Sequence, residues 1–277
     1  MPTYVIALIT IAAFVALLPF VLLAPRIAGR AKKAPFFNRN FAHRGLYDND
    51  NGIPENSLAA FEKAAENGYG IELDVQLSRD GRVVVFHDDT LSRVCCVDKR
   101  VDELDFDELS KLSLCGTGER IPLFEEVLRT VNGRAPIIVE LKNGRRNAEL
   151  CEKTLACLRG YKGDVCIESF NPLIVGWFRF HGREFFRGQL SQPKEFYTKE
   201  GFSKTTGFVL GNLLMNAIAR PNFIAYRIGK KPLALRFSKA LGAVVIGWTA
   251  HDTECEKDYD SVIFEHCIPT PEYTKKH

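Results

Sequence analysis

The chain has 277 residues, of which 46% are hydrophobic and 26% are charged, and its formal net charge is +3. This composition is typical of a globular protein and excludes a chain that is disordered throughout. The net charge is too small to indicate a nucleic-acid-binding protein. Eight cysteines occur without a CxxC pair, so no structural zinc site is expected. A reducing compartment fits them best, although their even number leaves disulfides open.

The N-terminal segment 4–24, YVIALITIAAFVALLPFVLLA, contains no charged residue. As a helix it spans about 30 Å, the thickness of the hydrocarbon core of a bilayer. Four basic residues follow it and none precedes it: Arg26, Arg30, Lys32 and Lys33. The positive-inside rule therefore predicts a single-pass membrane anchor over residues 1–33, with the domain at 34–277 in the cytoplasm. The alternative is a cleaved signal peptide, but the segment lacks the basic start and the shorter apolar core that such peptides have.

Beyond the anchor, strand-like apolar runs alternate with helix-like segments. Nine strands are predicted: 40–44, 70–76, 82–87, 135–142, 164–170, 186–190, 222–228, 243–249 and 261–265. The first helix is expected in SLAAFEKAAENG, where Asn56 or Ser57 caps the start and Gly68 ends it. Alternation of strands and helices over about 240 residues predicts a parallel sheet or a (β/α)8 barrel.

A hairpin explains why nine strands are predicted rather than eight. The segment between the second and third strands ends in Asp80-Gly81, a strong hairpin-turn signal. A turn centred there makes these strands antiparallel and sets His87 opposite Asp74. Eight parallel strands are then left, the number that a barrel needs. The predicted fold is thus an α/β (β/α)8 TIM barrel with an antiparallel β-hairpin after the second strand, preceded by one transmembrane helix.

Two strands place acidic side chains on one face. In Ile71-Glu72-Leu73-Asp74-Val75 the residues alternate, so Glu72 and Asp74 point the same way. The apolar face of a barrel strand packs on helices, which leaves the two carboxylates in the barrel interior or at its mouth. Buried like charges are costly unless a cation neutralises them, and a hard divalent cation does so well. Glu140 in the next parallel strand offers a third oxygen ligand. Lys142 shares its face and offers a cation for an anionic substrate, although a surface ion pair between the two is an equally good interpretation.

Histidine and arginine stand where other strands end. His87 closes the run VVVF, and His43 and Arg44 close the first strand. A single histidine at such a position is more often structural, but the hairpin brings His87 beside Asp74. Two imidazoles can divide acid and base work near neutral pH, and a guanidinium suits bidentate binding of phosphate. Together with a metal, these residues indicate phosphoryl chemistry on a diester.

The ordered motifs HRG, PENS, ELD, V-x-x-HDD-x-L-x-R, VELK and SFN resemble the glycerophosphodiester phosphodiesterase family. The resemblance covers the chain from residue 41 to about residue 269. It implies a (β/α)8 barrel that hydrolyses glycerophosphodiesters to glycerol 3-phosphate and an alcohol. It also implies one divalent metal ion, Ca²⁺ or Mg²⁺.

The resemblance assigns roles to individual residues. His43 and His87 match the catalytic histidines. The metal-binding carboxylates are Glu72, Asp74 and Glu140, and the phosphate-binding cations are Arg44 and Lys142. Glu55 in PENS is expected to support a neighbouring site residue. Trp248 occupies a position where the family often has an aromatic residue near the substrate, although a core position is equally expected.

Some segments depart from the family pattern or leave alternatives open. The segment 93–118 is shorter than in many bacterial members, which leaves the alcohol group of the substrate open. Segment 259–265 is interpreted as the last strand, without a chemical role. The long connection 191–221 contains an apolar cluster that fits a core helix or a lid touching the membrane or an acyl chain.

Three alternative functions follow from these departures. A lid of that kind would suit a lysophospholipid substrate and a lysophospholipase D-like activity. A phospholipase acting on lipid through the same barrel is a related possibility. A catalytically silent, tethered phosphoglycerol-binding module is the alternative outside enzymes, but every expected catalytic position is filled. The oligomeric state is left open.

Overall fold

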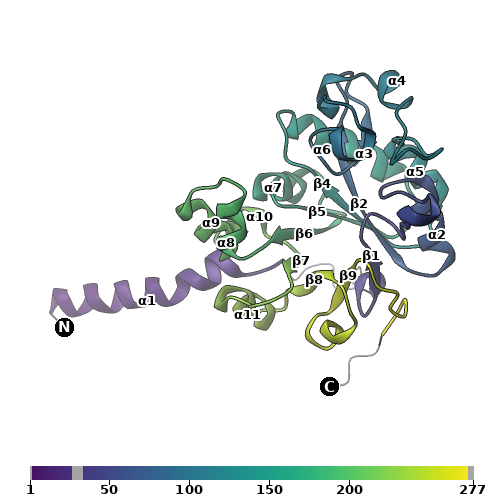
Figure 1. Ribbon diagram of the computed structural model, residues 1–277. Coiled ribbons are helices and arrows are strands. Elements are labelled where there is room, and N and C mark those ends of the chain that lie inside the picture. Colours follow the sequence, from purple (N-terminus) through teal and green to yellow (C-terminus); the bar gives the residue numbers. More distant parts are fainter. Residues whose placement is uncertain (1, 27–33, 274–277) are drawn as a thin grey trace.

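The computed structural model describes residues 2–26 and 34–273 (Figure 1). The N-terminal helix α1, Thr3–Leu23, projects from a barrel that contains the rest of the described chain. Nine strands form one sheet: β1 Asn40–Ala42, β2 Gly70–Leu77, β3 Val83–Val85, β4 Ile137–Leu141, β5 Val165–Ser169, β6 Phe186–Ser191, β7 Phe223–Arg227, β8 Val244–Ala250 and β9 Ser261–Phe264. Eight of them are parallel, and β1 closes the barrel by pairing with both β2 and β9. The predicted barrel is confirmed.

The remaining strand, β3, pairs antiparallel with β2, as predicted, but the predicted register is wrong by one residue. Val75 pairs with Val85, so Asp74 faces Phe86 rather than His87. The reason is a three-residue turn in which Gly81 adopts a φ of +77°. As a result, His87 lies beyond the end of β3, in the loop that follows it.

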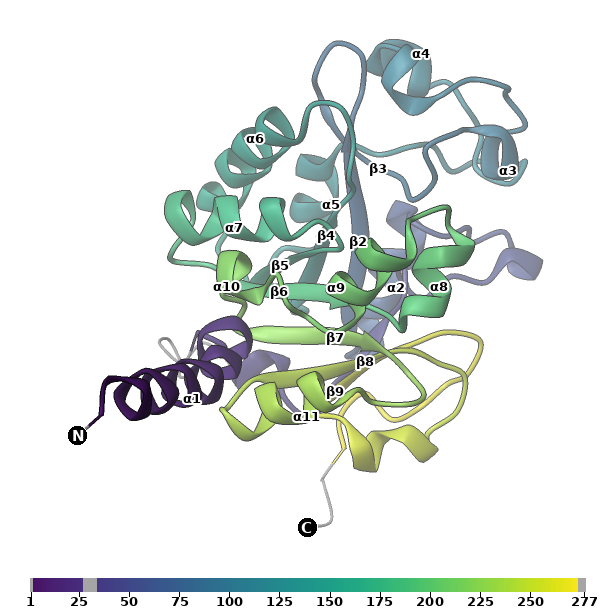
Figure 2. The same ribbon diagram turned by 90° about the vertical axis from the view of Figure 1, so that its left-hand side faces the viewer.

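Helices surround the barrel, and short 3-10 turns lie in its loops (Figure 2). The helices after α1 are α2 Leu58–Glu66, α3 Ser92–Cys95, α4 Phe106–Leu109, α5 Phe124–Val131, α6 Asn147–Gly160, α7 Pro172–His181, α8 Lys194–Lys199, α9 Lys204–Gly211, α10 Asn216–Ala219 and α11 Leu233–Ala240. The 3-10 turns are η2 Asn49–Asn51, η3 Val101–Glu103 and η4 Glu254–Asp258. The start of α2 is capped by Ser57, whose hydroxyl accepts a 3.1 Å hydrogen bond from the Ala60 amide.

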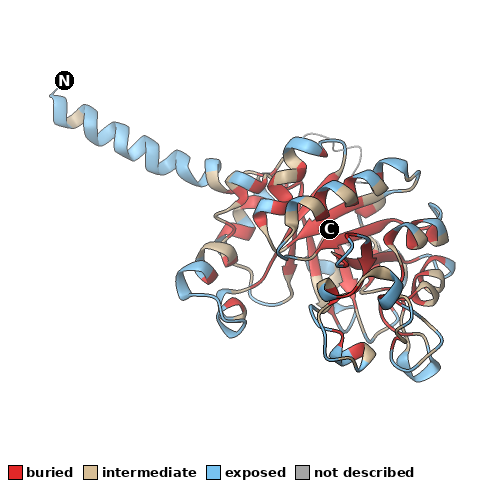
Figure 3. Ribbon diagram, turned by 90° about the horizontal axis from the view of Figure 1, so that it is seen from above, coloured by how far each residue is buried: buried red, intermediate tan, exposed pale blue. Residues whose placement is uncertain are grey.

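The buried strands separate two apolar layers (Figure 3). One layer lies between the strands and the helices and includes Ile137, Val139 and Leu141 on β4. The other fills the barrel interior and includes Ile138 on the opposite face of the same strand. Glu140 lies two residues beyond Ile138 on that inner face, so the interior changes from apolar to acidic toward the carboxyl ends of the strands.

Helix α1 ends against the barrel, beside α10 and α11 (Figure 2). Phe20 packs edge-on against Phe237 with ring centroids 5.1 Å apart, and the Ser238 hydroxyl donates a 3.0 Å hydrogen bond to the Leu23 carbonyl. Among the described residues, one helix is long and apolar enough to cross a membrane, and it is α1, with a mean hydropathy of 2.9. A signal sequence has the same properties. The predicted domain boundary between residues 33 and 34 borders a segment, 27–33, outside the described residues.

The connection 191–221 folds into α8, α9 and α10. The apolar side chains of this segment are partly buried and partly exposed: Leu213 is buried, whereas Phe208 and Ile218 are exposed. Both predicted roles for this segment therefore have a physical basis. All eight cysteines are free thiols.

Candidate active site

A cavity of about 490 Å³ opens at the carboxyl ends of the barrel strands. Six of the nine predicted site residues line it: His43, Arg44, Glu72, His87, Glu140 and Trp248. The other three, Asp74, Lys142 and Glu55, contact residues of this set. The predicted site residues therefore meet in one place, although they come from segments spread over 206 positions of the chain.

Three buried carboxylates lie close together, and two of them, Glu72 and Glu140, line this cavity. Ligand oxygens of Glu72, Asp74 and Glu140 lie within 4.8 Å of one another, and each residue is at most 8% exposed. Burial, together with the charges of Asp74 and Glu140, raises the pKa of Glu72 well above its usual value. Such a group of like charges fits a hard divalent cation, which prefers carboxylate oxygens and relieves their repulsion.

The turn after β1 directs two side chains into the cavity. Arg44 has a φ of +56° and Gly45 a φ of +81°, so the extended backbone ends at Ala42. A regular strand would point His43 and Arg44 to opposite faces. The Arg44 amide donates to Glu72 at 3.0 Å, and its guanidinium donates to Glu55 at 2.8 Å. Glu55 thus contacts Arg44, and its predicted supporting role stays a prediction.

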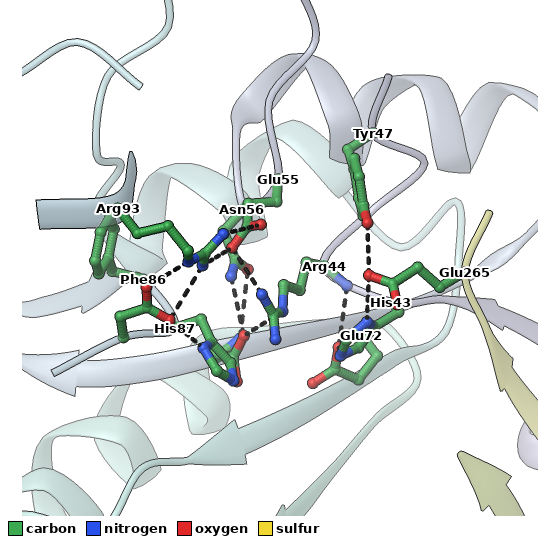
Figure 4. A network of polar contacts seen from close by, with 12 residues as sticks. His43, Arg44, Tyr47, Glu55, Asn56, Glu72, Phe86, His87, Arg93 and Glu265 are labelled. Carbon is green, nitrogen blue, oxygen red and sulfur yellow. Dashed lines mark hydrogen bonds and ion pairs between the residues drawn. The ribbon is translucent and has the colours of Figure 1, made fainter. Parts of the chain in front are cut away.

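His43 has an acidic partner at the barrel seam (Figure 4). Its Nδ1 lies 3.3 Å from Oε1 of Glu265, which also accepts a 2.5 Å hydrogen bond from the Tyr47 hydroxyl. Burial alone raises the pKa of Glu265, but the adjacent His43 and then Tyr47 outweigh it and lower this pKa to about 2. The carboxylate therefore stays charged and holds the imidazole in place.

His87 has a similar acidic partner on the other side of the cavity (Figure 4). Its Nδ1 lies 2.6 Å from Oδ1 of Asp88, and Arg93 contacts the other Asp88 oxygen at 2.6 Å. Arg93 also donates two hydrogen bonds to Glu55, at 2.7 and 2.8 Å. A continuous network thus connects His87 through Arg93 and Glu55 to Arg44.

Lys142 lies among the carboxylates rather than on the surface. Its ammonium group is 3.0 Å from Glu140 and 3.4 Å from Asp74. Burial lowers its pKa, but these two carboxylates outweigh burial, so the pKa lies above its usual value. The interpretation of Glu140 and Lys142 as a surface ion pair is therefore wrong, because the pair exists but Glu140 is buried and Lys142 is only partly exposed.

Trp248 forms part of an aromatic wall of the cavity. Its ring lies edge-on to Phe170 with centroids 5.5 Å apart, and the Arg227 guanidinium is 5.4 Å from its centroid. Arg227 also lies over the Phe196 ring of α8, at 4.2 Å. The connection 191–221 therefore reaches the rim of the cavity through Phe196.

Comparison with known proteins places this site in a family. The model of the Glycerophosphoryl diester phosphodiesterase family matches residues 43–263, most of the chain. The chain belongs to this family. The match includes both histidines and all three clustered carboxylates, but it ends before Glu265.

Relatives and solved structures of the family resemble the chain to different extents. A glycerophosphodiester phosphodiesterase of Caldanaerobacter subterraneus is 38% identical over 142 residues, 47% of this chain and 57% of that protein. The chain therefore spans little more than half the length of this relative. Human glycerophosphodiester phosphodiesterase 1 is 27% identical over 248 residues, 79% of this chain and 74% of that protein. A phosphodiesterase of Oleispira antarctica, solved with the product sn-glycerol-3-phosphate, has the same fold, with a TM-score of 0.67, 23% identity, and coverage of 83% of this chain and 93% of that one.

Four site residues of this family member were not predicted from sequence: Asp88, Arg93, Glu168 and Glu265. Glu265 directly follows the last barrel strand, and that position alone could have indicated a site residue. Glu168 on β5 pairs in register with Glu140 on β4. It lines the cavity and is 1% exposed. Its Oε2 has no hydrogen-bond partner among the described residues, and burial raises its pKa well above the usual value.

Proposed function

We propose that this protein hydrolyses glycerophosphodiesters to glycerol 3-phosphate and an alcohol. The observation that carries the proposal is a cluster of three buried carboxylates, two of which line one cavity together with two histidines and Arg44. The family membership and the glycerol 3-phosphate bound by the Oleispira antarctica phosphodiesterase support the same substrate class.

In this proposal Glu72, Asp74 and Glu140 hold one divalent cation, Ca²⁺ or Mg²⁺. When bound, the cation polarises a non-bridging phosphate oxygen. Arg44 binds the phosphate and opposes the negative charge that builds up during displacement. Lys142 does not line the cavity itself; its charge offsets those of Asp74 and Glu140 and would act on the phosphate at longer range.

The two histidines divide the proton transfers. One accepts a proton from the attacking water or from a glycerol hydroxyl, and the other gives a proton to the leaving alkoxide. Asp88 and Glu265 each face an Nδ1 atom, so each ring would act through its Nε2 atom, which in His43 also lies 4.0 Å from Oε2 of Glu72. Burial, and then the charges of Glu140 and Asp74, raise the pKa of Glu168 and favour its neutral form, which can donate a hydrogen bond to the substrate.

Metal removal and replacement test this proposal. The full-length protein is treated with a chelator and assayed on a panel of glycerophosphodiesters, with calcium, magnesium and manganese restored one at a time. We expect activity to be lost and then recovered with one of these ions. Phosphorus NMR identifies the products, and a product other than glycerol 3-phosphate contradicts the proposal. Tight substrate binding without turnover under every condition would instead indicate a silent binding module.

A lysophospholipid is the second candidate substrate, favoured by the apolar part of the cavity wall. Phe170, Leu190 and Trp248 line one side of the cavity, and Phe196 of α8 stands at the rim. An acyl chain could lie along these residues. Comparing lysophosphatidylcholine with glycerophosphocholine decides the matter, because no cleavage of the acylated compound eliminates this candidate.

We further propose that residues 1–33 form an uncleaved single-pass anchor and that residues 34–277 form a cytoplasmic catalytic domain. The length and hydropathy of α1 and the basic residues after it support this topology. A C-terminal reporter that is active only in the cytoplasm, combined with alkaline extraction of membranes, tests it. A mature protein that starts after residue 24, or a reporter active only outside, would contradict the anchor.

A further inference from the structure

Arginines gather around the end of α1, on the opposite side of the barrel from the cavity. Arg187 on β6 is only 1% exposed. Its guanidinium donates to the Arg220 carbonyl at 3.0 Å, while its Nη1 has no partner among the described residues. Burial lowers the pKa of Arg187 to about 10, and the nearby charges of Arg26, Arg179 and Arg183 add to that effect.

The neighbouring arginines use carbonyl oxygens as acceptors. Arg179 donates to the carbonyls of Ala217 and Ile218 at 3.1 Å, and Arg220 donates to the Ala24 carbonyl at 3.0 Å. No ion pair found between described residues includes an arginine of this cluster, which consists of Arg26, Arg179, Arg183, Arg187 and Arg220. Partly buried positive charge without an acidic partner is costly, so the cluster is suited to an anionic ligand.

Helix α1 fixes where this cluster lies relative to a bilayer. The Arg26 amide donates to the Pro221 carbonyl at 2.8 Å, so the chain leaving α1 runs directly past the cluster. The exposed ring of Phe180 on α7 lies beside Arg179, 5.1 Å from its guanidinium. Aromatic and basic side chains next to the end of an apolar helix are typical of the headgroup region.

We propose that the arginine cluster binds the phosphate of an anionic phospholipid headgroup, in the leaflet where the C-terminal end of α1 emerges. The inference rests on the membrane anchoring proposed above. It describes a second anion site, separate from the cavity. The cavity lies at the carboxyl ends of the strands, whereas Arg187 and the Arg26–Pro221 contact lie at the amino ends of β6 and β7.

Lipid binding to the full-length protein in detergent tests the inference. Phosphatidylglycerol or phosphatidylcholine is added, and bound lipid is measured by native mass spectrometry. We expect the wild type to prefer phosphatidylglycerol. In the double variant Arg179→Gln/Arg183→Gln, the ratio of phosphatidylglycerol binding to phosphatidylcholine binding should fall by about 30-fold. Each basic residue near anionic lipid contributes roughly a factor of five to this ratio. These residues are chosen because Arg187 is buried and its replacement can prevent folding.

A matched control removes the same charge elsewhere. Arg79→Gln/Arg134→Gln replaces exposed arginines that pair with acids, and it should keep the full preference. An equal preference in the wild type and the Arg179/Arg183 variant overturns the inference, as does equal binding of the two lipids by the wild type. Thermal melting confirms that each variant is folded. Hydrolysis of glycerophosphocholine by the same preparations tests the proposed function separately, and extraction of the protein from membranes tests the anchor.

Discussion

Each histidine in the cavity faces a carboxylate through Nδ1, Asp88 in one case and Glu265 in the other. In both imidazoles Nε2 is therefore the nitrogen that does not face this carboxylate, although Nε2 of His43 lies 4.0 Å from Glu72. Such pairing orients a ring and selects its tautomer, as acid and base groups require. Asp88 is the next residue in the chain after His87, whereas Glu265 lies far from His43 in the sequence. The two contacts therefore form independently of each other.

Replacement of either histidine tests their roles. We expect His43→Ala and His87→Ala each to lower kcat by at least about 100-fold, because each removes a proton-transfer group. Hydrolysis of glycerophosphocholine by the metal-loaded protein measures the loss. His181→Ala is a suitable control, since that exposed residue on α7 lies outside the cavity. Near-wild-type turnover in either cavity variant would refute acid–base catalysis by that residue.

Glu265 is predicted to act through His43 rather than on the substrate. Glu265→Gln should lower kcat by about 10- to 100-fold with little change in KM, the usual cost of losing a partner that orients a site residue. Glu265→Asp should recover part of the loss. A change confined to KM would point to direct substrate binding instead.

Glu265 should also contribute to the pH dependence of stability. Its pKa is lowered to about 2 in the folded protein, so its stabilising effect is fully present above the unfolded value and is lost as pH falls from about 4.5 to 2. The difference in unfolding free energy between the wild type and Glu265→Gln should therefore shrink over this range. Urea unfolding at neutral pH and at about pH 3 measures it. A constant difference would contradict the lowered pKa.

Among the elements, the turn between β1 and α2 depends on one glycine. At Gly45 the φ is +81°, and a Cβ there would lie 2.9 Å from the Cβ of Ala60 on α2. Gly45→Ala should destabilise the protein by at least about 1 kcal/mol and also reduce kcat, because the turn carries His43 and Arg44. Gly52→Ala is the matched control, with a φ of +73° and no atom within 4 Å. It should lose stability without losing activity, and an equal loss of activity in both variants would contradict the role of the turn.

The elements themselves were largely predictable from the sequence, because local patterns encode them. All nine strands formed where apolar runs predicted them, and the alternation in 71–75 placed Glu72 and Asp74 on the inner face. The hairpin register was not predictable, since it depends on how many residues the turn uses around Gly81. Contacts between distant segments were also missed. A closed barrel implies that β9 returns to β1, but no local pattern in the sequence marks Glu265 as the partner of His43.

At the scale of the whole molecule, the acidic cavity opposes folding unless a cation is bound. Buried carboxylates at short range repel one another. Burial, and then the charges of Asp74 and Glu140, raise the pKa of Glu72 well above its usual value. Calcium or magnesium should therefore raise Tm, since a ligand bound only by the folded state stabilises it. Glu72→Gln should raise the Tm of the metal-free protein and remove most of the metal-induced increase. Differential scanning calorimetry with and without chelator measures both effects, and an unchanged metal response in the variant would exclude Glu72 as a ligand.

The anchor contact and the cavity lie at opposite ends of the same strand. Asn222 just before β7 contacts Arg26, and Arg227 at the end of β7 lines the cavity. Five residues of strand separate them by roughly 16 Å. If residues 1–33 anchor the protein as proposed above, a water-soluble diester can enter the cavity directly, whereas a lipid must first leave the bilayer. This geometry favours the soluble substrate over the lysophospholipid.

The contact between His43 and Glu265 has a consequence for biosynthesis. The two residues flank the seam where the first strand meets the last, and 221 residues lie between them along the chain. A ribosome makes the His43 end first, so the nascent barrel stays open until β9 has emerged. A truncated or incompletely folded chain therefore lacks the partner that orients His43. On the function proposed above, catalysis would then require that β9 and Glu265 have been added to the barrel.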